Sequence, residues 1–211
     1  MRRTLFTAIA VAALAAPAAA QGPGRTLTIA ASATTVKFGT PVTLSGKLTG
    51  SNVDGRNVRV EADAFPVDSF DTAGNTDTNA TGDWTLAVTP AANTRYRARS
   101  GNTESGTVDV AVRPALRLRL SDRTPRVGTR VRFFGRVCPE HDGVKIAIQR
   151  RRAGTWRTVR SAILQDVAGS TCSKFSRRLK VRRDGAYRAR FHGDADHAAG
   201  KSRVRRANAH R

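Results

Sequence analysis

The chain has 211 residues and carries 37 Lys and Arg against 16 Asp and Glu, a formal net charge of +21. This length is enough for one large domain or two small ones. After the first 20 residues no segment is long and apolar enough to cross a bilayer, so we expect no transmembrane anchor.

The N-terminus has the three parts of a secretory signal. Arg2 and Arg3 precede an uncharged apolar stretch, Leu5–Leu14, which is followed by a helix-breaking Pro17 and then by small residues. The apolar part is too short to serve as a stable membrane anchor. We therefore predict cleavage after Ala20 and a secreted, extracellular protein that is associated with the cell wall or released.

Beyond this segment the apolar residues alternate with polar ones, as in strands with one buried face. Turn residues such as Asp54-Gly55 and Asp142-Gly143 separate the runs, and no long helical period is present. We predict an all-β fold of packed antiparallel sheets. The predicted strands, in chain order, include 42–48, 58–62, 84–88, 96–98, 108–112, 116–120, 131–137 and 144–148.

The chain also repeats itself. Gly46 matches Gly135 at an offset of 89, and the sequence Tyr-Arg-Ala-Arg at 96–99 recurs at 187–190. Two similar units are the simplest account, and Pro114 lies at the short seam between them. The predicted organisation is a signal peptide (1–20), a first β-sandwich domain (21–113), a second β-sandwich domain (114–206) and a basic tail (207–211).

The segment Asp184–Ala189 resembles strand F of the immunoglobulin fold, in which Asp, Gly and Tyr precede a Cys. The loop that follows, with Gly193-Asp194, is similar to that of bacterial immunoglobulin-like repeats of exported surface proteins. The resemblance covers residues 26–206 in two tandem copies and implies spacers or ligand-binding modules. It also implies a structural tyrosine corner at Tyr96 and Tyr187, where each hydroxyl would bond the backbone upstream.

Both cysteines, Cys138 and Cys172, lie in the second unit. In an exported chain an even pair predicts a disulfide, the alternative being two buried free thiols. Ala98 and Ala189 stand where the family has its strand-F Cys, so the usual bridge between sheets is absent. We expect Cys138 to anchor the loop that contains Cys172.

Two groups of residues were weighed as metal sites. The first lies in one loop and consists of His192, Asp194, Asp196 and His197. Its Gly-Asp is already explained by the repeat pattern, so we predict no metal there. The second imitates a calcium loop and consists of Asp71, Asn75, Asp77, Asn79 and Asp83. It lacks the required Gly and the bidentate Glu, so we expect a solvated hairpin between strands.

No catalytic set is present, since no Ser occupies a Gly-x-Ser-x-Gly turn and the cysteines are expected to be oxidised. We predict a protein that is not an enzyme and has no cofactor; a deep pocket with converging polar groups would argue otherwise. Trp84 falls in an alternating apolar strand and is expected in the core. Trp156, at a hairpin, is the better candidate for an exposed aromatic.

Beyond the predicted signal peptide, the excess of basic over acidic residues is confined to the second unit. Residues 21–113 carry nine basic and nine acidic residues, whereas residues 114–211 carry 26 and seven. A genome rich in Arg codons, or a solvated surface, would also give many arginines, but such a bias should raise both units alike. We predict that the second domain binds an anionic polymer: a cell-wall polymer, an acidic polysaccharide or extracellular DNA. The predicted binding residues are Arg117, Arg119, Arg130, Arg132, Arg177, Arg178, Lys180, Arg182, Arg183, Arg188 and Arg190. The alternative is a structural spacer or adhesion repeat with no specific polyanion ligand.

Overall fold

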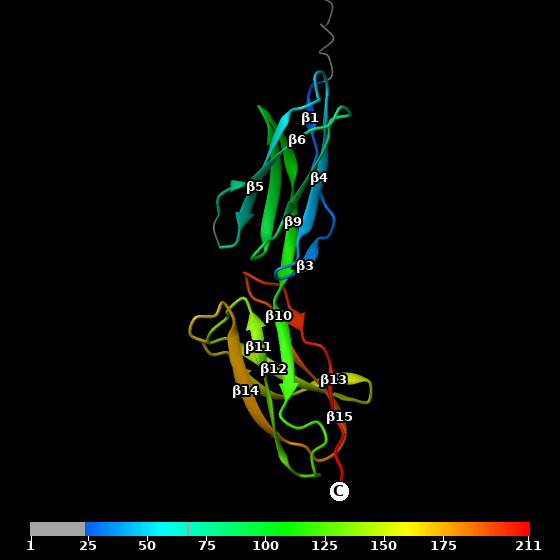
Figure 1. Cartoon of the computed structure of the whole chain (residues 1–211), viewed down its shortest axis with the longest axis vertical. Helices are drawn as coiled ribbons and strands as arrows, with labels where there is room; N and C mark the ends of the chain where they lie inside the picture. Colours follow the sequence, from blue (N-terminus) through cyan, green and yellow to red (C-terminus); the bar gives the residue numbers. More distant parts are fainter. Residues whose placement is uncertain (1–23, 67) are drawn as a thin grey trace, which may run out of the picture.

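The computed structural model describes residues 24–66 and 68–211, so the predicted signal peptide lies outside the described residues. Within them the chain forms seventeen strands and no helix. The strands gather into two groups stacked end to end, which we call the N-terminal half (up to Arg113) and the C-terminal half (from Pro114) (Figure 1). The prediction of an all-β chain is confirmed. Across this same part of the chain no helix is long and apolar enough to span a membrane.

The N-terminal half is built from two sheets. In one, β4 lies between β7 on one side and the short β1 and β2 on the other, all antiparallel. The other has the order β3-β9-β8-β5-β6, and only its β3 runs parallel to its neighbour. The strands are β1 (Thr26–Leu27), β2 (Ala30–Ala31), β3 (Thr35–Lys37), β4 (Val42–Thr49), β5 (Asn57–Ala64), β6 (Asp71–Asp77), β7 (Asp83–Val88), β8 (Thr94–Ser100) and β9 (Thr103–Arg113).

The C-terminal half repeats this plan. One sheet has the order β10-β11-β14; the other has the order β13-β12-β15-β16, with β17 also pairing with β15. A parallel bridge from Arg126 to His210 takes the place of the β3–β9 pairing. The strands are β10 (Ala115–Leu120), β11 (Arg130–Cys138), β12 (Lys145–Arg152), β13 (Thr155–Ile163), β14 (Ser173–Lys180), β15 (Gly185–Phe191), β16 (Gly200–Lys201) and β17 (Arg205–Ala207).

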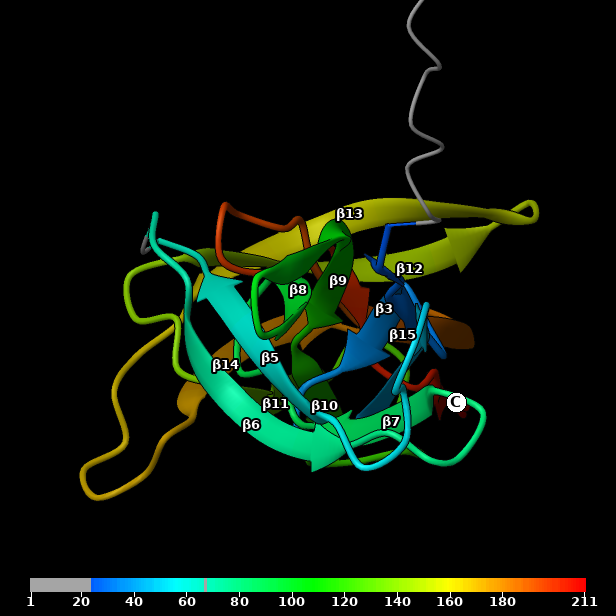
Figure 2. The same cartoon turned by 90° about the horizontal axis from the view of Figure 1, so that it is seen from above.

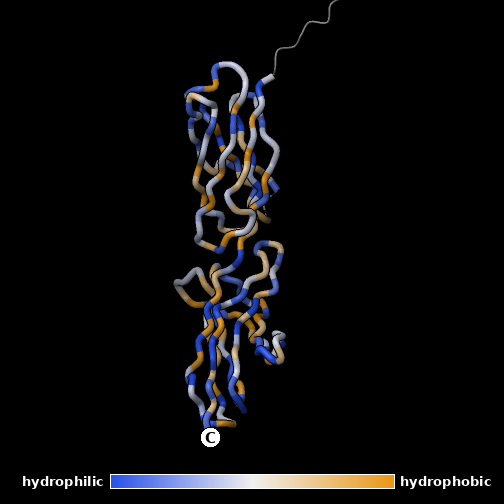
Figure 3. Tube along the Cα trace, turned by 90° about the vertical axis from the view of Figure 1, so that its right-hand side faces the viewer, coloured by the Kyte–Doolittle hydropathy of each residue, from blue (hydrophilic) through white to orange (hydrophobic). Residues whose placement is uncertain are grey.

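Each half has its own hydrophobic core between its two sheets. The alternation along the strands, visible as changing colour in Figure 3, turns one face of each sheet inward. Trp84 is buried in the first core, as predicted, and Phe175 holds the corresponding place in the second. Each ring packs over a glycine of the neighbouring strand, Gly46 and Gly135 respectively, where an added Cβ would overlap a backbone carbonyl. The repeated glycines therefore mark equivalent close backbone contacts, Gly46 with Thr28 and Gly135 with Arg117.

A single residue, Pro114, joins β9 to β10, so the halves are linked by almost continuous extended chain. Hydrogen bonds also cross the junction. The Asn93 backbone N–H donates to the Asp196 carbonyl at 2.7 Å, and the Ala198 N–H donates to the Val112 carbonyl at 2.8 Å. From above, the β12–β13 hairpin extends sideways past the outline of the N-terminal half (Figure 2).

The disulfide Cys138–Cys172 is present as predicted. Cys138 ends β11, and Cys172 directly precedes β14, the strand that pairs with β11. The bridge therefore joins two neighbours of one sheet and anchors the long β13–β14 connection. It also holds Ser173, whose hydroxyl accepts a hydrogen bond from the His141 N–H at 2.7 Å.

Two local expectations differ from the structure. Residues 207–211, predicted as a separate tail, are part of the C-terminal half, because β17 reaches Ala207 and the His210 N–H donates to the Pro125 carbonyl at 3.0 Å. The expected hairpin at Asp71–Asp83 is instead a crossover, because β6 and β7 belong to different sheets. Its turn is held by the Asn79 side chain, which accepts hydrogen bonds from the N–H groups of Thr81 and Asp83.

Candidate polyanion-binding surface

Acidic residues are excluded from the strands of the C-terminal half. All seven lie in turns and loops: Asp122, Glu140, Asp142, Asp166, Asp184, Asp194 and Asp196. The exposed side chains that alternate with the core along these strands are therefore basic or neutral. An uninterrupted positive potential over the sheet faces follows from this placement.

This surface includes a groove of about 890 Å³ between the edge strand β10 and the strands β15 and β16. Four of the predicted residues meet there: Arg117 and Arg119 from β10, Arg188 and Arg190 from β15. Its lining contains no acidic residue. The structure adds five basic residues that the sequence reasoning did not select: Lys37, Arg113, Lys201, Arg203 and Arg205. Since Lys37 belongs to the N-terminal half, the groove spans the junction.

The groove continues over β10 onto the outer face of the β10-β11-β14 sheet. A hollow of about 600 Å³ on this face shares Arg117 and Arg119 with the groove and also contains Arg132 and Phe134. Phe134 is half-buried, and the Arg132 guanidinium lies 4.5 Å from its ring centroid. The sequence contains a signal for this face that was not used: Phe134 is an aromatic residue at a position where the alternation along β11 predicts a polar, outward-facing side chain. The face therefore combines charge with an apolar stacking surface.

The other predicted residues are not brought to this groove. Arg130, Arg178 and Lys180 line a smaller hollow of about 280 Å³ between β14 and the β12–β13 hairpin, at the opposite edges of the two sheets. Arg177 and Arg178 line a third hollow, also beside β13. Arg182 and Arg183 are exposed in the turn before β15 and lie outside these hollows.

Equivalent arginines of the two halves have different hydrogen-bond acceptors, one charged and one neutral. In the N-terminal half the Arg97 Nε donates to the buried Glu61 at 2.7 Å, across the β5–β8 pair. In the C-terminal half the equivalent Arg188 Nε donates to Gln149 at 2.8 Å, across the β12–β15 pair. The hydrogen bond is kept, but the neutral amide leaves the Arg188 charge without a counter-charge.

The same loss occurs at every other acid that forms an ion pair in the N-terminal half. The acids Asp83, Glu104 and Asp109 are paired in the ladder with Lys47, Arg99 and Arg95, respectively. At the equivalent ladder positions the C-terminal half has Lys174, Lys201 and Arg206. Within residues 24–66 and 68–211, all seven ion pairs between Lys or Arg and a carboxylate consequently lie in the N-terminal half.

The pKa values of the two equivalent arginines shift in opposite directions. The hydrogen bond and charge of Glu61, with Glu104 beside it, raise the pKa of Arg97. Burial lowers the pKa of Arg188, and the like charge of Arg190 lowers it further. Its guanidinium also stacks on the half-buried Trp156, 4.3 Å from the ring centroid. Arg188 is therefore held in place by neutral groups and would gain from an anion.

The two tyrosines of the predicted corners, Tyr96 and Tyr187, are buried in the two cores. Burial raises the pKa of both. The Tyr187 ring meets Phe133 edge to face at 4.7 Å. The hydrogen bond from each hydroxyl to the upstream backbone remains a prediction.

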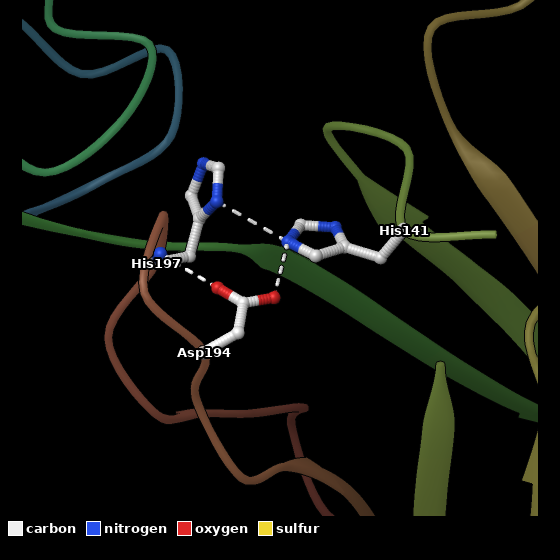
Figure 4. A group of neighbouring side chains, drawn as sticks. All are labelled: His141, Asp194 and His197. Carbon is white, nitrogen blue, oxygen red and sulfur yellow. Dashed lines mark hydrogen bonds and ion pairs between the residues drawn. The ribbon is translucent and has the colours of Figure 1, made fainter. Parts of the chain in front are cut away.

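The histidine-rich loop is rearranged relative to the sequence-based grouping. His192 and Asp196 are exposed, whereas His197 is buried and faces His141, which comes from the loop between β11 and β12 (Figure 4). Asp194 completes a group whose ligand atoms all lie within 4.8 Å of one another. Sequence reasoning missed His141, because it lies 56 residues before its partner.

Neither protein-family models nor curated proteins match this chain.

Proposed function

We propose that this protein is a secreted, non-enzymatic binding protein of two immunoglobulin-like domains, and that its C-terminal half binds an anionic polymer. The carrying observation is the loss, at the equivalent ladder positions, of all four acids that pair with cations in the N-terminal half. A general excess of Arg codons would add cations to both halves. It would not replace Glu61, Asp83, Glu104 and Asp109 by Gln149, Lys174, Lys201 and Arg206.

The immunoglobulin-like assignment is supported by strand order. In each half the strand that directly precedes the tyrosine strand joins the sheet of the first strands, as β7 does with β4 and β14 does with β11. In the other sheet the tyrosine strand, β8 or β15, lies between an earlier strand, β5 or β12, and the last strands of its half. In both halves the N-terminal segment also makes a parallel contact with the C-terminal segment, β3 with β9 and Arg126 with His210. Separate cores and a one-residue connection favour two tandem domains, and the disulfide is consistent with export.

The chemistry of the groove favours an extended polymer of phosphate, carboxylate or sulfate groups. Guanidinium groups donate paired, parallel hydrogen bonds to such oxyanions. The rows run along strands, so successive cations are spaced to meet successive charges of a chain rather than one small ion. Cell-wall polymers, acidic polysaccharides and extracellular DNA share this repeating charge.

The test is binding of the whole chain to three polymers, duplex DNA, heparin and inorganic polyphosphate, over a range of salt. The double variant Arg188→Ser with Arg190→Ser should weaken binding and lower the salt dependence by about two phosphate contacts for DNA. The matched control, Lys47→Ser with Arg95→Ser, removes the same charge from exposed positions of the N-terminal half. It should leave binding unchanged.

The competing function is a spacer or adhesion repeat without a polyanion ligand. It predicts no measurable affinity for any of the three polymers at physiological salt. An equal loss of affinity in the two double variants would contradict a binding site on the C-terminal half, because the overall charge alone would then explain the loss.

A further inference from the structure

A cluster at the junction of the halves brings together two buried histidines and the exposed Asp194, three groups that bind metals. The His141 Nε2 atom lies 3.2 Å from His197 Nδ1 and 3.6 Å from Asp194 Oδ2 (Figure 4). The His141 and His197 residues are only 8% and 5% exposed. His141 comes from the β11–β12 loop, and the other two come from the β15–β16 loop. Two separate connections of the C-terminal half thus converge on one point.

The outer nitrogens of both rings face groups that only accept hydrogen bonds. His141 Nδ1 lies 2.9 Å from the Pro139 carbonyl, and His197 Nε2 lies 2.8 Å from the Ala91 carbonyl. Each of these nitrogens must therefore carry the proton and donate it. In the neutral tautomers the inner nitrogens, His141 Nε2 and His197 Nδ1, then both present lone pairs to each other.

Two lone pairs at 3.2 Å, with a carboxylate beside them, require a positive species between them. We propose that this species is a divalent transition-metal ion, zinc being the best match, held by His141 Nε2, His197 Nδ1 and Asp194 Oδ2. Tetrahedral zinc with ordinary bond lengths separates its ligand atoms by about 3.3–3.4 Å, which lies between the two distances observed. Three protein ligands leave a fourth position for water.

The surroundings have the features of a prepared site. Both imidazoles donate their outer N–H to a backbone carbonyl, the arrangement that fixes the tautomer of metal-binding histidines. The other carboxylate oxygen, Asp194 Oδ1, accepts a hydrogen bond from the backbone N–H of His197 at 2.8 Å, which leaves Oδ2 free for the ion. The His141 ring packs edge to face on Phe191 at 4.6 Å, and Ser173, next to the disulfide, holds its backbone.

The position of the site assigns the ion a structural role. The Ala91 carbonyl, which accepts the hydrogen bond from His197 Nε2, belongs to the N-terminal half, and the nearby Asn93 donates hydrogen bonds to two carbonyls of the same β15–β16 loop. Fixing His197 therefore fixes the contact between the halves. The site is independent of the basic groove, whose lining includes none of the three ligands.

The experiment is a zinc titration by calorimetry of the whole, disulfide-bonded chain after removal of metals with EDTA. One ion should bind per chain. His141→Gln and Asp194→Asn should each weaken binding by about a hundredfold or more. The matched controls His192→Gln and His210→Gln alter exposed histidines outside the cluster and should change affinity less than twofold. Circular dichroism and a thiol count establish that the variants fold.

A measurement on the unaltered chain keeps the proposal testable if a variant fails to fold. X-ray absorption of the zinc-loaded protein should show two imidazole ligands, oxygen for the rest and no sulfur. Absence of stoichiometric binding, or a ligand set without two imidazoles, would overturn the proposal and leave a shared proton as the positive species. Equal affinity in the His141→Gln and control proteins would assign the zinc to adventitious surface sites and overturn it as well.

Discussion

Restoring the lost acids is the sharpest perturbation of the basic surface. The variant Gln149→Glu, Lys174→Asp, Lys201→Glu, Arg206→Asp recreates in the C-terminal half the four acids that pair with cations in the other half. It lowers the charge of that half by seven, from an excess of nineteen to twelve. Because the N-terminal half already accommodates these acids at the same ladder positions, the fold should tolerate them.

The expected effect follows from counterion release. Each lost contact with duplex DNA lowers the slope of log affinity against log salt by about 0.9. Three removed cations therefore lower it by about 3, and at about 0.15 M salt this corresponds to a loss of about a hundredfold in affinity. The loss should be greater than this, because three of the new acids, at positions 149, 174 and 201, also lie opposite the remaining Arg188, Arg136 and Arg190.

The assay is fluorescence anisotropy of a labelled duplex at several salt concentrations. A control with the same charge change, placed at exposed positions of the N-terminal half, is Thr72→Glu, Lys47→Glu, Arg56→Glu, Arg95→Glu. Affinity of the restored variant within twofold of the parent would refute the role of the lost acids. An equal loss in the control would refute the localisation of binding to the C-terminal half.

Three further predictions concern stability. Gly135→Ala should lower the free energy of unfolding by about 1–3 kcal/mol in urea titrations, because the new methyl group overlaps the Arg117 carbonyl; an unchanged midpoint would contradict the close approach. The disulfide joins residues 34 positions apart, so its reduction should lower the free energy of unfolding of the C-terminal half by about 3–4 kcal/mol. Two titratable thiols before reduction would contradict the disulfide. Burial raises the pKa of Glu61, but the Arg97 hydrogen bond and nearby arginines outweigh this and set the pKa below its usual value. The stabilisation is therefore complete above the ordinary pKa of Glu and is lost as pH falls through the folded-state value, so Glu61→Gln should flatten the acid limb of the stability profile measured by denaturant titration.

Local patterns predicted the sheets well because they depend on short-range alternation. The period of two along Val42–Leu48 and Val131–Val137 identified the buried faces of β4 and β11, and the repeated glycines identified equivalent strands. The end of the chain was harder, since Arg205–Ala207 is a short edge strand without a clear apolar run. Its place depends on pairing with β15, which is distant in sequence.

The exposure of the candidate binding residues could be predicted where the alternation along a strand alone decides it. The alternation correctly predicted that Arg117 and Arg119 are exposed. It did not indicate that these arginines of β10 would line one groove with Arg188 and Arg190 of β15. The contribution of Lys37, and the substitution of Glu61 by Gln149, emerge only when the registers of the two halves are compared. The histidine cluster required a contact between two loops, which no local pattern contains.

The cations on the strand edges have a consequence for self-association. The edge strands β10, β13, β14 and β17 each carry at least two Lys or Arg, so the open backbone edges of the C-terminal half repel those of another copy. On the proposed function, a bound polyanion would cancel that repulsion and at the same time concentrate copies of the protein along one polymer chain. The electrostatic protection against edge-to-edge stacking would then be lost on binding, and we expect the free protein to stay dispersed and to associate through its edges only on such a polymer.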